Sequence, residues 1–95
     1  MIEYNGKIRK KGKYKMKVLL IIPAYNEEEN ILKTVKKIEE YSNEIDYIVI
    51  NDGSKDRTEE ILKENQIKHI QLVKNLGIGG AVQTGYKYAY ENGYD

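Results

Sequence analysis

The sequence predicts an α/β protein, in which strands and helices alternate as β-α-β-α-β-α to form the three-layer half of a doubly wound parallel sheet. Short apolar runs suited to buried strands occur three times, and each is followed by a turn cluster and then by a helical pattern. Because parallel strands are joined by right-handed crossovers, we expect the strand order 3-2-1 with helices on both faces. The expected strands are 18–22, 47–50 and 70–73, and the expected helices are 27–42, 56–64 and 80–91.

The first strand is the apolar run VLLII at residues 18–22, which is too short for an ordinary helix. Pro23 follows and ends the strand, because it has no backbone N–H to donate. Asn26 is a residue type that caps helix N-termini, and Glu29 stands at capping-box spacing after it. These signals predict that Asn26 caps a helix over residues 27–42, whose apolar side chains recur at helical spacing.

The second and third units repeat this plan. The strand at 47–50 ends in the turn sequence Asn-Asp-Gly-Ser at 51–54, and a helix is expected from about residue 56. The strand at 70–73 ends in a glycine-rich turn at 75–80. The helix that follows carries small residues four apart, which predicts a close approach to the sheet; they are Ala81, Gly85 and Ala89.

Composition limits the function classes. The 95 residues suit a single domain, and no apolar run approaches the ~20 residues that cross a bilayer. The absence of cysteine excludes disulfides and thiolate chemistry, and the single histidine excludes a site that needs two. No export signal is recognised in the sequence, so a cytoplasmic location is expected.

The N-terminal segment, residues 1–17, carries a net charge of +6, whereas residues 18–95 carry −5. Two structures are open for this basic arm: a solvated, partly disordered segment, or a small hairpin that turns at Asn5-Gly6. A contact of residues 7–17 with anionic lipid headgroups is a further interpretation. Nucleic acid is not an expected partner, because the basic run has neither a recognition helix nor an aromatic stacking platform.

The candidate binding groups follow the first two strands. Tyr25 and Glu27 follow one strand and Asp52 follows the next, and ligands bind at the carboxyl ends of strands in open α/β sheets. A tyrosine ring can pack on a nucleotide base while a carboxylate accepts from the ring N–H, and Lys74 can offset phosphate charge. The competing structural interpretation is a tyrosine half-buried at a strand end, and an aspartate that bonds its own backbone before Gly53.

Three motifs in order carry a resemblance to a known family: IIPAYNEEENI, IVINDGSKDRTEEIL and VKNLGIGGAVQTGYKYA. Together they resemble the start of an inverting family 2 glycosyltransferase of the Rossmann-like GT-A fold. The similarity is greatest to the branch that moves sugars onto polyprenyl phosphates, such as dolichyl-phosphate mannosyltransferases, which suggests cell-envelope glycan synthesis of the bacterial type. The resemblance runs from about residue 18 to residue 95.

The resemblance implies a donor that is a UDP- or GDP-sugar, and Mg²⁺ or Mn²⁺ as the metal of the full-length enzyme. It places the nucleotide against residues from all three motifs, namely Pro23, Ala24, Tyr25, Glu27, Asp52, Lys74, Asn75 and Gly77. The family's Asp-x-Asp metal motif occurs nowhere in the sequence, and its catalytic base lies further along the family's chain. We therefore assign no catalytic or metal-binding residue, and expect residues 18–95 to be a truncated donor-binding half, inactive alone, at the cytoplasmic face of a membrane.

Two alternatives remain. One is a non-catalytic nucleotide-binding module, which would use the same turns without transferring a sugar. The other is a self-associating fragment. If no fourth strand covers residues 18–22, that strand is a bare apolar edge, and such edges recruit another chain. A homo-oligomer that pairs through this strand is the expected consequence.

Overall fold

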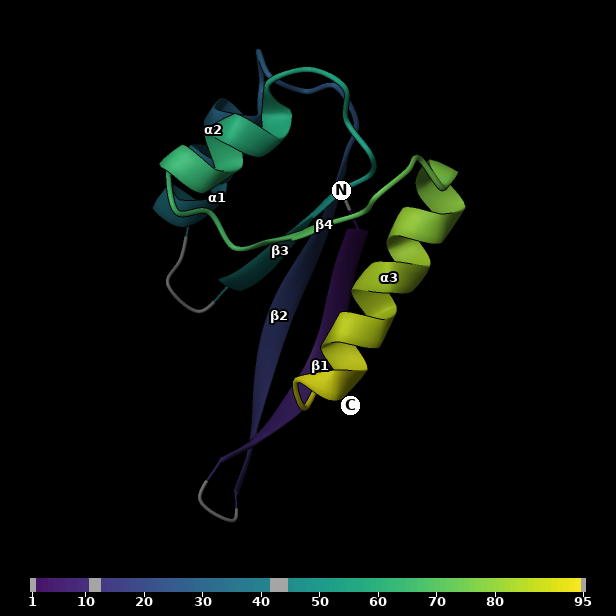
Figure 1. The fold of residues 1–95 in the computed structure, drawn as a ribbon. Coiled ribbons are helices and arrows are strands. Elements are labelled where there is room, and N and C mark those ends of the chain that lie inside the picture. The colour runs from purple at the N-terminus through teal and green to yellow at the C-terminus, as the bar shows by residue number, and fades with distance from the viewer. Residues whose placement is uncertain (1, 11–12, 42–44, 95) are drawn as a thin grey trace.

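A computed structural model describes residues 2–10, 13–41 and 45–94 of the chain, and Figure 1 shows its fold. Four strands form one sheet in the order β1-β2-β3-β4. Three helices cover it, with α1 and α2 on one face and α3 on the other (Figure 1). The elements in chain order are β1 Ile2–Lys10, β2 Lys13–Ala24, α1 Ile31–Tyr41, β3 Ile45–Asn51, α2 Thr58–Glu64, β4 His69–Gln71 and α3 Gly77–Glu91.

The predicted β-α-β-α-β-α unit is confirmed, and it runs from β2 to α3. β2 pairs in parallel with β3, and β3 pairs in parallel with β4, which gives the expected order 3-2-1 for the three predicted strands. The third strand was predicted at 70–73 but covers only His69–Gln71. Val73 lies beyond it and is exposed.

The central strands are buried on both faces, as their uninterrupted apolar sequences predict. Because side chains alternate along a strand, Ile22 of β2 packs with α1 and α2, whereas Leu19 and Ile21 pack against the face that α3 covers. In β3, Val49 likewise packs with α1 and α2, whereas Ile50 packs in the core that α3 covers. The sheet therefore separates two apolar cores, one on each side.

The close approach predicted for the third helix is confirmed. Its small residues Ala81, Gly85 and Ala89 are buried against the sheet. A Cβ atom at Gly85 would lie 2.3 Å from Cγ2 of Ile21, so no larger side chain fits without movement. The helix begins at Gly77 rather than at residue 80, because the predicted glycine-rich turn is partly helical.

The N-terminal segment is a β-hairpin. β1 pairs antiparallel with β2 from Ile2 opposite Ile21 to Lys10 opposite Lys13, so residues 2–10 and 13–17 are extended strands rather than a disordered arm. The prediction of a turn at Asn5-Gly6 is wrong, because both residues lie inside β1 and the chain reverses after Lys10.

The predicted apolar edge is also wrong. β1 covers the side of β2 that would have recruited a second chain, so no homo-oligomer through residues 18–22 is expected. The sequence held a signal for this strand that was missed: Ile2, Tyr4 and Ile8 alternate with polar or charged residues, which is the period of a half-buried strand. In the part of the chain that the structure describes, no helix has the length and hydropathy needed to cross a bilayer.

Candidate functional site

The site is built where β2 and β3 end side by side. Ala24 and Asn51, the last residues of the two strands, are direct partners in the parallel register. The amide of Asp52 extends this pairing by donating to the carbonyl oxygen of Ala24 at 2.8 Å. The two following turns therefore start at the same level, as predicted.

Asn26 joins the two turns instead of capping a helix. The backbone amide of Asn26 donates to Oγ of Ser54 at 2.9 Å. Its side-chain Oδ1 accepts from the backbone amide of Lys55 at 2.8 Å. Its φ is +54°, in the left-handed region that asparagine tolerates better than most residues. The helix predicted from residue 27 therefore starts only at Ile31, and the Asn26–Glu29 capping box is absent.

Two further amides of the first turn bond to side chains at the start of α2. The Glu27 amide donates to Oγ1 of Thr58 at 2.9 Å, and the Glu28 amide donates to Oδ2 of Asp56 at 3.1 Å. Partial burial of Asp56 favours its protonated form, but hydrogen bonds from Thr58 and Glu28 outweigh this and hold the pKa of the carboxyl below its ordinary value. We call the four side chains that tie the turns together the clasp; they are Asn26, Ser54, Asp56 and Thr58.

Asp52 ties a third segment to the first two. Its carboxylate is buried, and Oδ1 accepts from the amide of Leu76 at 2.7 Å. Its carbonyl oxygen accepts from Nδ2 of Asn75 at 3.1 Å, and Oδ1 of Asn75 accepts from the amide of Gly77 at 3.1 Å. Asp52 therefore bonds the loop that precedes α3, rather than only its own turn.

A cavity of about 610 Å³ opens between the turns. Tyr25 is 43% exposed and lines it, together with Lys74 and Asn75. Of the other predicted residues, none lines this cavity: Pro23 and Ala24 end β2, Glu27 is held by Thr58, Asp52 lies beneath the loop, and Gly77 starts α3. The full lining is Tyr25, Gly53, Ser54, Lys55, Glu59, Gln71, Leu72, Val73, Lys74 and Asn75.

Sequence reasoning missed several lining residues. Ser54 and Lys55 belong to the same turn as Asp52, and that shared turn was an available signal. Gln71 gave none, because a glutamine in a short strand has many roles. In the structure its Oε1 accepts from Nδ2 of Asn51 at 2.7 Å, and Oδ1 of Asn51 accepts from the hydroxyl of Ser54. Among the missed residues, Lys55 matters most for charge, because it adds a second cation to the cavity wall beside Lys74.

The residues present do not fit the divalent metal that the resemblance implies. Across residues 2–10, 13–41 and 45–94, no three carboxylate, imidazole or thiolate side chains come together. The Asp52 carboxylate is already bonded to the Leu76 amide. We therefore derive no step that passes through a metal ion.

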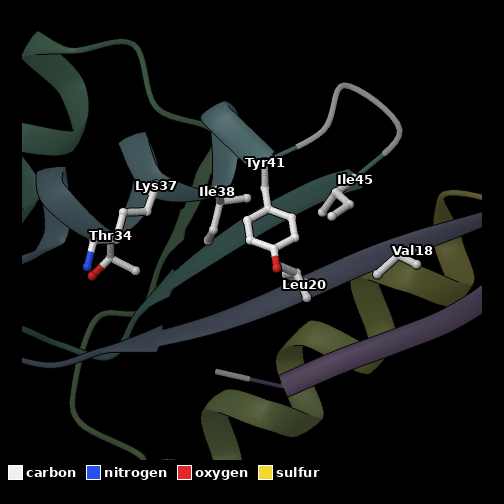
Figure 2. Close-up of a pocket in the computed structure, with 7 residues that line it drawn as sticks. All are labelled: Val18, Leu20, Thr34, Lys37, Ile38, Tyr41 and Ile45. Atoms are coloured by element: carbon white, nitrogen blue, oxygen red, sulfur yellow. The ribbon is translucent and has the colours of Figure 1, made fainter.

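A second cavity of about 550 Å³ shares no lining residue with the first and lies between α1, the middle of β2 and the start of β3. Figure 2 shows the ring of Tyr41 projecting over Leu20, with Val18 and Ile45 beside it. Its lining is mainly apolar, and it holds none of the predicted site residues. The only ammonium group in the lining belongs to Lys37.

The comparisons with known proteins decide the family. Residues 19–93 match the family model described as glycosyl transferase family 2. This chain belongs to glycosyltransferase family 2. The matched region contains both cores except Tyr94, and all three segments of the candidate site, so the predicted resemblance is confirmed.

Its relatives include transferases that are named for polyprenyl-type lipids. The chain is 39% identical to a UDP-N-acetylglucosamine–dolichyl-phosphate N-acetylglucosaminyltransferase of Methanococcus voltae, over 82% of this chain and 38% of that protein. It is 32% identical to an undecaprenyl-phosphate mannosyltransferase of Micrococcus luteus, over 84% and 35%. It is 36% identical to a dolichol-phosphate mannosyltransferase of Pyrococcus furiosus, over 78% and 23%. The chain thus spans less than two fifths of each of these relatives, and no solved structure matches it.

Proposed function

We propose that the cavity at the carboxyl ends of β2 and β3 binds the nucleotide of a nucleotide-diphosphate sugar. The observation that carries this proposal is the position of one exposed aromatic ring, Tyr25, in the same cavity wall as two cations, Lys55 and Lys74. A nucleoside diphosphate combines a flat base with two anionic phosphates. An aromatic face and ammonium groups are the side chains suited to these parts.

The proposed roles follow from these positions. The ring of Tyr25 packs on the base, and Lys74 and Lys55 offset the charge of the phosphates. The resemblance implies that Asp52 accepts a hydrogen bond from the base. Because its carboxylate is buried, bonded to the Leu76 amide and outside the cavity lining, this contact requires the loop at Asn75 to shift when the nucleotide binds. The buried Asp52 also keeps Asn75 in place at the rim, because its carbonyl oxygen accepts from the Asn75 side chain.

The reaction proposed for this family member is transfer of a sugar, with inversion, from a UDP- or GDP-sugar to a polyprenyl phosphate. The lipid acceptor is supported by the names of the Methanococcus, Micrococcus and Pyrococcus relatives. The 95-residue chain would supply the donor-binding part, at the cytoplasmic face of a membrane. A divalent metal and a catalytic base would have to come from residues outside these 95.

Calorimetric titration of the purified chain with UDP, UDP-glucose and GDP, with and without Mn²⁺, tests the donor site. We expect uridine-dependent binding that does not need metal and that Asp52→Ala abolishes. Glu91→Ala removes an exposed carboxylate at the end of α3 and is the matched control, which should bind like the wild type. A folded wild-type chain that binds no nucleotide would refute the proposal.

The non-catalytic alternative uses the same cavity and differs only in chemistry. Sugar transfer to a polyprenyl phosphate by the 95-residue chain alone would exclude it, and would also refute the expectation that this chain is inactive alone. The same chain combined with the remainder of a family 2 domain should gain activity if the transferase proposal is correct.

Lipid contact through residues 7–17 is a separate proposal about location. The hairpin reverses after Lys10, at the far end of β2 from Ala24. With a rise of ~3.3 Å per residue, the hairpin end lies roughly 36 Å from the cavity along the strand. Contact there would anchor the protein without presenting an acceptor to the cavity. Co-sedimentation with anionic vesicles, and none with neutral ones, is the expected result.

A further inference from the structure

The clasp contains two side chains to which the proposed function gives no role. Thr58 is fully buried at the first position of α2, and Asp56 lies two residues before it. Neither lines the cavity of Tyr25. Both nevertheless bond the backbone that continues from Tyr25, since Thr58 accepts from the Glu27 amide and Asp56 from the Glu28 amide.

The first turn depends on these bonds because it has little regular structure of its own. It begins where β2 ends at Ala24, and α1 starts only at Ile31. Three consecutive amides, those of residues 26, 27 and 28, donate to side chains of the second turn and of the segment that starts α2. The bond of the Glu27 amide is part-buried whereas the other two are exposed, and a partly buried amide that loses its acceptor costs more than an average hydrogen bond gains. The second turn therefore determines the backbone path of the first.

The Thr58 hydroxyl both donates and accepts a hydrogen bond within the clasp. Its hydroxyl donates to Oδ1 of Asp56 at 2.5 Å and accepts from the Glu27 amide at 2.9 Å. The Thr58 amide donates to the same Oδ1 at 2.9 Å, so the carboxylate fixes the direction in which the hydroxyl points. Serine can make both hydroxyl bonds, whereas valine has the same shape as threonine and can make neither.

We propose that Thr58 and Asp56 are positioning residues of the nucleotide site, which hold the first turn so that the exposed ring of Tyr25 faces the base. This inference rests on the proposed function of the cavity. Tyr25 is fixed on its other side by Ala24, whose carbonyl oxygen accepts from the Asp52 amide. The ring itself is 43% exposed, so its place is set mainly through the backbone on either side.

A purely structural role for Thr58 would predict a different response to mutation. It would lower the stability of the whole chain, and amide protection in the core would fall along with protection in the turn. A positioning role predicts a local loss: the amides of Glu27 and Glu28 exchange faster while Val49, in the centre of the sheet, keeps its protection. The two cases are therefore separable by residue-resolved hydrogen exchange.

The test compares Thr58→Val with Thr58→Ser, and uses Thr84→Val as a matched control. Thr84 lies on α3, where its hydroxyl donates to the Gly80 carbonyl oxygen at 2.9 Å, so its loss removes a hydroxyl away from the clasp. For Thr58→Val we expect UDP affinity to fall about tenfold, with faster exchange at Glu27 and Glu28. Thr58→Ser should restore affinity to within about twofold, and Thr84→Val should leave it unchanged.

Two outcomes would overturn the inference alone. One is wild-type UDP affinity in Thr58→Val, and the other is an equal loss of protection at Glu27 and Val49 in that variant. Absence of UDP binding by the wild-type chain would instead refute the proposed function, and the positioning role with it. The wild-type titration thus separates the two failures.

Discussion

Replacement of Gly53 by alanine tests how tightly the second turn packs against the loop before α3. Gly53 has φ = +67°, and a Cβ atom there would lie 2.4 Å from the amide nitrogen of Asn75 and 2.5 Å from the carbonyl carbon of Lys74. Both are backbone atoms, so no side-chain rotation relieves the contact. The loop must move, and this puts at risk the bond from the Leu76 amide to Asp52.

The size of the effect follows from two contributions. A left-handed backbone costs an alanine about 1–2 kcal/mol relative to glycine. Loss of a hydrogen bond to a charged acceptor adds about 1.5–3 kcal/mol. We therefore expect Gly53→Ala to lower the free energy of unfolding by roughly 2.5–5 kcal/mol, a large part of the ~5–15 kcal/mol typical of a domain.

Gly93 supplies the matched control. Its φ is +85°, similar to that of Gly53, but a Cβ atom there meets nothing within 4 Å. Gly93→Ala should therefore show the backbone cost alone, about 1–2 kcal/mol. Urea unfolding of both variants, followed by circular dichroism, measures the difference. Equal destabilisation by the two substitutions, within about 0.5 kcal/mol, would refute the reasoning that the Asn75 loop packs directly on Gly53.

Three further changes have defined outcomes. Gly85→Ala should destabilise the chain by about 1–3 kcal/mol in urea unfolding, because the new methyl group overlaps the fully buried Ile21; an unchanged midpoint would contradict this close packing. Leu62→Ala, at a fully buried position on α2, should cost about 2–5 kcal/mol in the same assay. Burial and then the hydrogen bond to Glu39 raise the pKa of Tyr47 to about 12 from 10.0, so its contribution to stability is complete below pH 10 and is lost as the pH rises toward 12. Tyr47→Phe should therefore reduce the fall in melting temperature between pH 10 and 12, and an identical fall would contradict the raised pKa.

The parallel half of the sheet could be predicted because its signals are local. The run at 18–22 is too short for a helix and is apolar throughout, which indicates a strand covered on both faces. The same reasoning placed Tyr25 and Asp52 in adjoining turns. The proximity was correct because neighbouring parallel strands present their carboxyl ends at one edge of the sheet.

The remaining features depend on contacts between distant residues. Asn26 and Glu29 have the local signature of a helix start, but Asn26 bonds to Ser54 and Lys55, which are nearly thirty residues away. These contacts draw the first turn toward the second and delay α1 until Ile31. No local pattern shows that Asn26 bonds to this distant turn instead of capping a helix. The strand β1 itself had a local signal, the alternation of Ile2, Tyr4 and Ile8 with polar residues, but that pattern does not identify β2 as the strand with which it pairs.

The hairpin also determines which strand of the sheet is exposed at its edge to pairing with another molecule. Without β1, the apolar β2 would be a template for cross-β aggregation. With it, one rim is a strand whose sequence includes Lys7, Arg9 and Lys10, and the other is β4, which has only three residues. Basic residues in an edge strand discourage pairing with a further strand, and a three-residue strand forms few backbone hydrogen bonds. The N-terminal hairpin thus acts as a gatekeeper against strand-by-strand growth.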